Sequence, residues 1–248
     1  MSRTLCIANQ KGGVGKTTTS VNVATGLADA GHSVLLVDMD PQCNATSGLG
    51  LAPVAQHPLI VDSPIRHGVL ATNVNGLDLL PGSGSFRDAD ALANSNSKAS
   101  RIVVEHLRKG AMVYDYVLLD CPPSLGTLTR AALSASKEVL LPVQCEYFAM
   151  EGLTQMISVI REVMLERPGE LTFGGIVLTM YDESLELTTE VDADLRQFFG
   201  EVVFDTVIPR DVHVAEAPSH GLSVLDYAPR SRGSRAYTEL CMEILERD

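Results

Sequence analysis

The sequence of 248 residues predicts an α/β fold: a mostly parallel, twisted sheet flanked by helices on both faces. Two observations favour this class. Short apolar runs alternate with longer helical patterns along the chain, which is typical of repeated strand–helix units. A glycine-rich loop also joins the first apolar run to the first helical pattern. Because 45% of the residues are hydrophobic, the chain can bury one large core, and we expect a single domain over residues 1–248.

The individual elements follow from the apolar pattern and from the glycine and proline residues that interrupt it. The expected strands are residues 4–8, 33–37, 77–80, 116–119, 138–142, 174–178 and 202–207. The expected helices are residues 16–30, 100–109, 127–135, 150–166, 187–199 and 234–246. Residues 51–97 are rich in proline, glycine, serine and asparagine, so we expect turns there and no separate domain.

The loop after the first strand reads Gln10-Lys11-Gly12-Gly13-Val14-Gly15-Lys16-Thr17-Thr18. A strand, a glycine-rich turn and a helix start form the context of a phosphate-binding loop, whose backbone N–H groups surround a phosphate. In such a loop Lys16 reaches the β- and γ-phosphates and the Thr17 hydroxyl binds Mg²⁺. The usual motif has glycine six residues before this lysine. Here Gln10 stands there, and a second lysine, Lys11, follows it.

This two-lysine loop resembles the deviant Walker A box of the ParA/MinD group of P-loop ATPases, closest to its small chromosome-partitioning, Soj-like branch. The resemblance implies a P-loop NTPase architecture and the cofactors ATP or ADP with Mg²⁺. It also implies that Lys16 acts on nucleotide bound to its own chain, whereas Lys11 reaches across to nucleotide bound by the partner of an ATP-bound homodimer. The nucleotide-binding residues that it implies here are Lys11, Gly12, Gly13, Val14, Gly15, Lys16, Thr17 and Thr18.

Three carboxylates follow apolar strands, at the edge where ligands of such sheets bind. Asp38 and Asp40 come after one strand and Asp120 ends another. Buried acidic groups require a cation or a proton nearby, so these carboxylates are candidates to bind Mg²⁺. By the resemblance, Asp40 positions the attacking water as a catalytic residue beside Lys16 and Lys11, while Asp120 and Asp38 support the metal together with Thr17. A plain capping role for Asp38 or Asp40 is the alternative.

The resemblance also assigns an adenine-binding region near the end of the chain, which the chemistry of the residues alone does not identify. Pro209 and Asp211 lie in the loop that packs over the base in relatives, and Met180 is a second candidate contact. Relatives commonly carry asparagine where this chain has Asp211. An ionised aspartate only accepts hydrogen bonds, which suits the amino group of adenine.

Composition restricts the class of protein. No apolar stretch approaches the ~18 residues of a membrane span, and the acidic C-terminal helix differs from the basic amphipathic helix that binds MinD to membranes. We therefore expect no membrane partner. The five cysteines, Cys6, Cys43, Cys121, Cys145 and Cys241, include no C-x-x-C pair and indicate reduced thiols. We expect a cytoplasmic protein, associated with the nucleoid if it binds DNA.

The expected function is a dimerisation switch with slow, Mg²⁺-dependent ATP hydrolysis, which partitions chromosomes or plasmids with a ParB-like partner and nonspecific double-stranded DNA. The net charge of −12 opposes DNA binding, and Ser184 and His213 replace two arginines that often contact DNA in relatives. The remaining basic cluster is Arg230, Arg232 and Arg235, and a solvated loop is the alternative interpretation. Two other functions stay open: positioning of a different cellular cargo, and a metabolic ATP-dependent ligase of the P-loop class.

Overall fold

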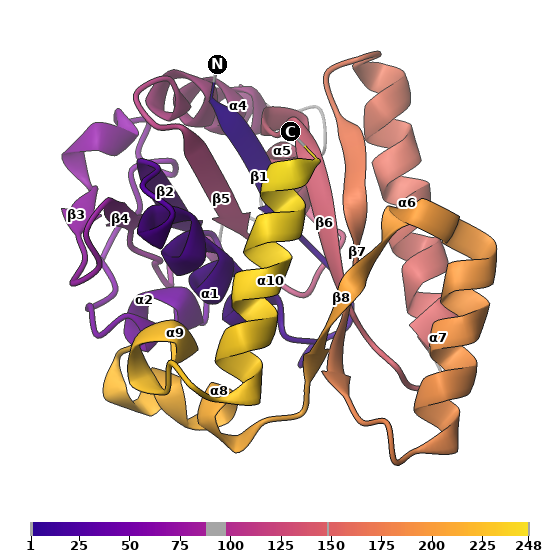
Figure 1. Cartoon of the computed structure of the whole chain (residues 1–248). Coiled ribbons are helices and arrows are strands. Elements are labelled where there is room, and N and C mark those ends of the chain that lie inside the picture. The colour runs from indigo at the N-terminus through magenta and orange to yellow at the C-terminus, as the bar shows by residue number, and fades with distance from the viewer. Residues whose placement is uncertain (1, 88–97, 148, 248) are drawn as a thin grey trace.

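A computed structural model of the chain describes residues 2–87, 98–147 and 149–247. Within these residues one sheet has the strand order β3-β4-β2-β5-β1-β6-β7-β8 (Figure 1). Only β3 runs antiparallel to its neighbour. The strands are β1 (Arg3–Ile7), β2 (Val34–Asp38), β3 (Leu70–Ala71), β4 (Leu77–Leu80), β5 (Tyr116–Asp120), β6 (Glu138–Gln144), β7 (Thr172–Tyr181) and β8 (Val203–Pro209). The predicted mostly parallel α/β sheet is confirmed.

Helices connect the strands and cover both faces of the sheet. The longer ones are α1 (Lys16–Asp29), α4 (Lys98–Ala111), α5 (Thr127–Ala135), α6 (Ala149–Glu166), α7 (Glu186–Phe199) and α10 (Arg232–Glu246). Short turns of helix are α2 (Asn44–Gly48), η1 (Ile65–His67), η2 (Gly200–Val202), α8 (Val212–Glu216), η3 (Ala217–His220) and α9 (Val224–Tyr227). Among the described helices, we find none with the length and apolar character that a membrane span requires.

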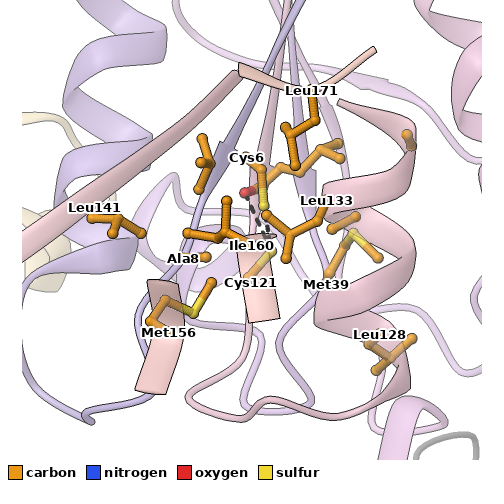
Figure 2. Packing of buried hydrophobic residues seen from close by; sticks show 14 of the residues in the cluster. Cys6, Ala8, Met39, Cys121, Leu128, Leu133, Leu141, Met156, Ile160 and Leu171 are labelled. Carbon is orange, nitrogen blue, oxygen red and sulfur yellow. Dashed lines mark hydrogen bonds between the residues drawn. The ribbon is translucent and has the colours of Figure 1, made fainter. Parts of the chain in front are cut away.

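Alternate residues of the central strands face two separate cores. Leu5 and Ile7 of β1 pack with apolar residues of α1 and α10, which cross in front of the sheet in Figure 1. Cys6 and Ala8 point to the other face and join the side chains of α4, α5, α6 and α7. Figure 2 shows part of this second core, where the Sγ atoms of Cys6 and Cys121 lie 3.4 Å apart. All five cysteines are buried free thiols.

The seven expected strands and six expected helices are present: β4 and α5 have the expected bounds, and the others have shifted ends. The pattern missed the two-residue β3 and the short helices, whose few residues carry too little periodicity. It also ended β6 at Pro142, whereas the strand continues to Gln144. Proline fits there because the pairing of β6 with β1 ends before Pro142, so the missing N–H of proline costs no hydrogen bond to β1. The Pro142 carbonyl accepts a bond from the Asn9 side chain at 2.8 Å. Of the turn-rich segment 51–97, residues 88–97 lie outside the described residues.

Sheet register places the important strand ends together. Asp38 at the end of β2 is the neighbour of Asp120 at the end of β5, and Asp120 is in turn the neighbour of Ile7 at the end of β1. The glycine-rich loop begins at Gln10, three residues after Ile7. The fold therefore brings the loop and two of the acidic residues to one edge of the sheet.

Candidate active site

The glycine-rich loop is held open between β1 and α1 by its neighbours. Asn9 accepts a bond from the Lys11 backbone N–H at 3.0 Å, and Thr179 of β7 donates its hydroxyl to the Val14 carbonyl at 2.9 Å. Gly13 and Gly15 have φ of 75° and 88°, a left-handed conformation that residues with a Cβ adopt only with strain. No side chain caps the start of α1 at Gly15. The first N–H groups of this helix thus remain available for an anion.

The two lysines of the loop point to different places. Lys16 is buried, and its Nζ donates to the Lys11 carbonyl at 2.9 Å. Burial lowers the pKa of Lys16, and the nearby carboxylates of Asp120 and Asp40 oppose that shift. Lys11 instead extends its ammonium group to the surface, where it forms an ion pair with Glu146 at the end of β6. One lysine therefore lies inside the loop and the other lies at its rim.

Asp120 lies at the bottom of the site with no exposed surface. Its two oxygens accept hydroxyl bonds from α1, from Thr17 at 2.9 Å and from Ser20 at 2.8 Å. Burial, reinforced by the charge of Asp38, raises the pKa of Asp120 to about 7. A carboxylate whose ionised form is so disfavoured is one that a bound cation would stabilise.

Asp38 organises the segment that follows β2. Its carboxylate accepts bonds from the Asp40 N–H at 3.2 Å and from the backbone N–H and hydroxyl of Thr46 at 2.9 and 2.6 Å. Thr46 also accepts from the Gly82 N–H at 2.8 Å, so Asp38 connects α2 to the loop after β4. Burial raises the pKa of Asp38 despite these bonds. Its place as a metal-binding residue stays a prediction, because these bonds already give it a positioning role.

Asp40 lies two residues after Asp38 and is 5% exposed. One of its oxygens accepts the Gln42 N–H at 2.8 Å, which fixes the start of the turn leading into α2. Cys43 ends this turn with a φ of 56°, a conformation that favours glycine. Asp40 acts electrostatically on both Lys16 and Asp120. The structure therefore gathers Lys16, Asp40, Asp120 and Thr17 in one place.

In the described residues, no group of three or more His, Cys, Asp or Glu side chains has the arrangement of a metal site. The predicted donors are instead the Thr17 hydroxyl and carboxylates, and their role stays a prediction. Mg²⁺ in such sites keeps several waters and takes its remaining ligands from substrate phosphates. The Thr17 hydroxyl and the Asp120 carboxylate, which lie 2.9 Å apart, suit Mg²⁺ bound together with a nucleotide.

A pocket of about 190 Å³ opens beside the glycine-rich loop. Gly15 and Thr18 form one wall, and the predicted base contacts Met180, Pro209 and Asp211 line the rest. Met180 has a φ of 50°, a left-handed conformation near the end of β7, where the register with β8 is irregular. A second pocket of about 310 Å³ lies on the other side of Thr17 and Thr18, under α2 and η3. A larger hollow of about 650 Å³ lies at the opposite edge of the sheet, far from these side chains.

Comparisons with known proteins agree with this geometry. A family model described as an AAA domain matches residues 2–173. The chain is 44% identical over 252 residues to the sporulation initiation inhibitor protein Soj of Bacillus subtilis, covering 98% of each chain. It is 42% identical over 254 residues to the chromosome partitioning protein ParA of Caulobacter vibrioides, covering 99% of this chain and 95% of that one. The chain belongs to the ParA/Soj family of P-loop ATPases.

Solved structures of related proteins have the same fold. A cobyrinic acid a,c-diamide synthase from Mycobacterium smegmatis, with bound ADP and magnesium, is 32% identical with a TM-score of 0.85, over 99% of this chain and 95% of that one. The cell division ATPase MinD of Pyrococcus furiosus is 26% identical with a TM-score of 0.83 over the full length of both chains. The predicted P-loop NTPase architecture is thereby confirmed.

The arginine cluster of this ParA/Soj-family chain lies close to the base pocket. Arg232 begins α10, Arg230 precedes it, and Arg235 lies one turn further along, all with exposed side chains. Within the described part of the chain, none of the three forms an ion pair. Arg210 and Arg232 both lower the pKa of Asp182, although the bonds from Ser184 contribute more. The place of Arg230, Arg232 and Arg235 as DNA-binding residues stays a prediction.

Three residues of the site were not predicted from the sequence. Ser20 binds Asp120, Thr46 binds Asp38, and Glu146 pairs with Lys11. Ser20 lies one helical turn after Lys16, so its spacing offered a weak signal that it shares a face with the loop. Thr46 and Glu146 offered none, because their contacts depend on how separate loops meet.

Proposed function

We propose that this chain is an ATP-dependent dimerisation switch that hydrolyses ATP slowly in the presence of Mg²⁺. It acts in partitioning chromosomes or plasmids, together with a ParB-like partner and DNA bound without sequence preference. The name of the Caulobacter vibrioides relative, a chromosome partitioning protein, supports this role. The bound ADP and magnesium of the Mycobacterium smegmatis structure support the choice of ligands.

The residues of the site fit a nucleoside triphosphate. The uncapped start of α1 and the N–H groups of the loop offer donors to phosphate oxygens, and Lys16 is already buried beside them. Asp120 and Thr17 lie together at 2.9 Å and are the groups that hold Mg²⁺, directly or through water. When bound, Mg²⁺ neutralises charge on the phosphates. Met180, Pro209 and Asp211 line the pocket that takes the base.

Hydrolysis depends on a group that orients a water towards the terminal phosphate. Asp40 is the carboxylate placed for this role, because it lies near Lys16 and Asp120 and one oxygen is already fixed by the Gln42 N–H. Among the described residues, the other carboxylates near Lys16 accept more hydrogen bonds from the protein than Asp40 does. With Asp40 as a single acceptor to orient the water, we expect ATP hydrolysis to stay slow until a partner protein completes the site.

The direction of Lys11 is the observation that carries the dimerisation proposal. Its ammonium group lies at the rim of the loop, on Glu146, while Lys16 occupies the interior. Lys11 is thus placed to meet a phosphate bound by a second copy. Exposed apolar side chains follow the parallel strands at this same edge: Tyr147 after β6, Leu185 and Leu187 after β7, and Val212 after β8. Covering such side chains is a driving force for association.

The test of the site is ATP turnover and nucleotide binding in two variants. Lys16→Ala should lose tight nucleotide binding, whereas Asp40→Ala should bind ATP normally and hydrolyse it at least about tenfold more slowly. Asp194→Ala, which removes an exposed carboxylate on α7, is the matched control and should behave as the wild type. Wild-type turnover in Asp40→Ala would remove the assigned role of Asp40.

A metabolic ligase remains a second candidate, because the Mycobacterium smegmatis structure carries the name of a synthase. Such an enzyme needs an acceptor site and has no use for a lysine directed away from its own phosphates. Positioning of another cargo by the same switch is a variant of the main proposal. A gene for a ParB-like protein next to the gene for this chain would favour partitioning over both.

A further inference from the structure

Asp211 lines the base pocket, yet its carboxylate is bonded to the protein itself. One oxygen accepts the His213 backbone N–H at 2.9 Å and also lies 2.9 Å from the Nδ1 atom of the same residue. The other oxygen accepts the Gly233 N–H at 2.8 Å. A carboxylate has about four lone-pair positions, so three are occupied. Only 7% of the side chain is exposed.

These bonds join three parts of the chain. Asp211 follows β8, His213 lies in the first turn of α8, and Gly233 is the second residue of α10. Val214 of α8 lines the base pocket, and a Cβ atom at Gly233 would lie only 2.2 Å from its Cγ2 atom. Since Gly233 has no Cβ, the start of α10 packs directly against the wall of the pocket. Asp211 is the side chain that fastens the two together.

We infer that Asp211 is a positioning residue of the base pocket and that its carboxylate does not select the base. It fixes the wall formed by residues 209–215 against the start of α10, and the base is read by main-chain groups and by the shape of the pocket. This inference rests on the proposed nucleotide site. It replaces the expectation that Asp211 accepts the amino group of adenine.

The two roles differ in what they predict for guanine. A carboxylate that accepted a bond from the amino group of adenine would repel the O6 carbonyl oxygen of guanine. Its removal would therefore weaken ATP and leave GTP unchanged or improved. A positioning carboxylate acts on the wall, so its removal weakens both nucleotides by the same factor.

The test is equilibrium titration of fluorescent ATP and GTP analogues with Mg²⁺ on the wild type and three variants. Asp211→Ala should weaken both nucleotides about fivefold, the equivalent of a helix cap worth about 1 kcal/mol, with their ratio constant within about twofold. Asp211→Asn keeps one acceptor oxygen and should show a smaller, equally shared loss. Ser231→Ala is the matched control, because it removes the cap of α10, where Ser231 accepts the Ser234 N–H at 3.1 Å, without touching the pocket. Ser231→Ala should lower the melting temperature about as much as Asp211→Ala does, but it should keep the affinities for ATP and GTP.

Three results would overturn the inference. A collapse of the ATP preference in Asp211→Ala would show that the carboxylate reads the base. Unchanged affinities for both nucleotides would show that the wall does not need Asp211. Equal losses in Ser231→Ala would assign the effect to general loosening of α10. If Asp211→Ala does not fold, Asp211→Asn decides between the roles by the same ratio. Failure of the wild type to bind either nucleotide is a separate result that removes the proposed function and this inference with it.

Discussion

The ammonium group of Lys11 pairs with the carboxylate of Glu146 in its own chain, at the surface beside the glycine-rich loop. The two side chains are 35% and 46% exposed, so water and salt screen their attraction. Such pairs contribute only about 0–1 kcal/mol. The contact is therefore weak enough to be exchanged for a phosphate of a second copy, and Glu146 competes with that phosphate for Lys11.

Neutralising Glu146 should favour the ATP-bound dimer. In Glu146→Gln each protomer loses a competing pair worth about 0.5 kcal/mol, so the dimer should tighten about fivefold in total. The free energy of unfolding should change by less than about 0.5 kcal/mol. Sedimentation equilibrium with Mg-ATP measures the first quantity and urea titration the second.

The matched control for this change is Glu162→Gln, which breaks the exposed Arg130–Glu162 pair between α5 and α6. It should leave association unchanged. A weaker dimer in Glu146→Gln, with the control unaffected, would mean that Glu146 itself contacts the partner.

Stability should depend on the protonation of His57, which is fully buried. Its Nδ1 atom accepts the Leu59 N–H at 3.2 Å, and its ring packs on Phe86 with the centroids 4.4 Å apart. Burial lowers the pKa of His57 to about 3, from an ordinary value of 6.5. The unfolded chain thus binds a proton below pH 6.5 that the folded chain refuses.

The contribution of His57 is complete above pH 6.5 and is lost as the pH falls from 6.5 towards 3, by up to about 1.4 kcal/mol per pH unit. His57→Asn keeps an acceptor near Nδ1 and does not titrate, so its free energy of unfolding should depend less on pH. His67→Asn, at an exposed histidine, is the control and should keep the wild-type slope. Urea titrations between pH 7.5 and 5 provide the comparison. Equal slopes in His57→Asn and the wild type would show that His57 accepts a proton in the folded chain.

DNA binding by the ATP-bound form should be weak, independent of sequence and lost early as salt rises. Arg230, Arg232 and Arg235 are exposed and form no ion pair within the described residues, whereas Ser184 and His213 supply no fixed charge. Each lost phosphate contact lowers the log–log salt slope by about 0.9. Replacement of all three arginines by alanine should therefore remove most of the binding to random duplex.

Arg161→Ala on α6 provides the control for this surface, since α6 packs on the opposite face of the sheet from α10. It should leave both the affinity and the salt slope unchanged. Tight binding at physiological salt that survives the triple replacement would place the DNA on another surface.

The strand ends of the site could be predicted because their causes are local. The continuous apolar runs before Asp38 and Asp120 indicate strands buried on both faces, and parallel strands bring their carboxyl ends to one edge. The glycine pattern before Lys16 fixed the loop for the same reason. Short elements such as α2 and α8 lack the length at which periodicity identifies a helix.

The bonds of the acidic residues could not be predicted, because they depend on where separate segments meet. Asp38 binds Thr46 only because the chain reverses after Asp40, and Asp211 binds Gly233 only because α10 returns to β8. The family resemblance offered Asp211 as a base contact, because the matching loop of relatives packs over adenine. The structure adds the bonds of the carboxylate to His213 and Gly233, and the positioning role that we infer rests on them.

In the proposed switch, Lys11 joins two nucleotide-bound copies of this chain. Sedimentation velocity of Asp40→Ala measures it most directly, because slow hydrolysis preserves the ATP state during the run. We expect a dimer with Mg-ATP, a monomer with Mg-ADP, and a monomer with Mg-ATP once Lys11→Ala is added. A double variant that still dimerised with Mg-ATP as Asp40→Ala does would contradict the role of Lys11 across the interface.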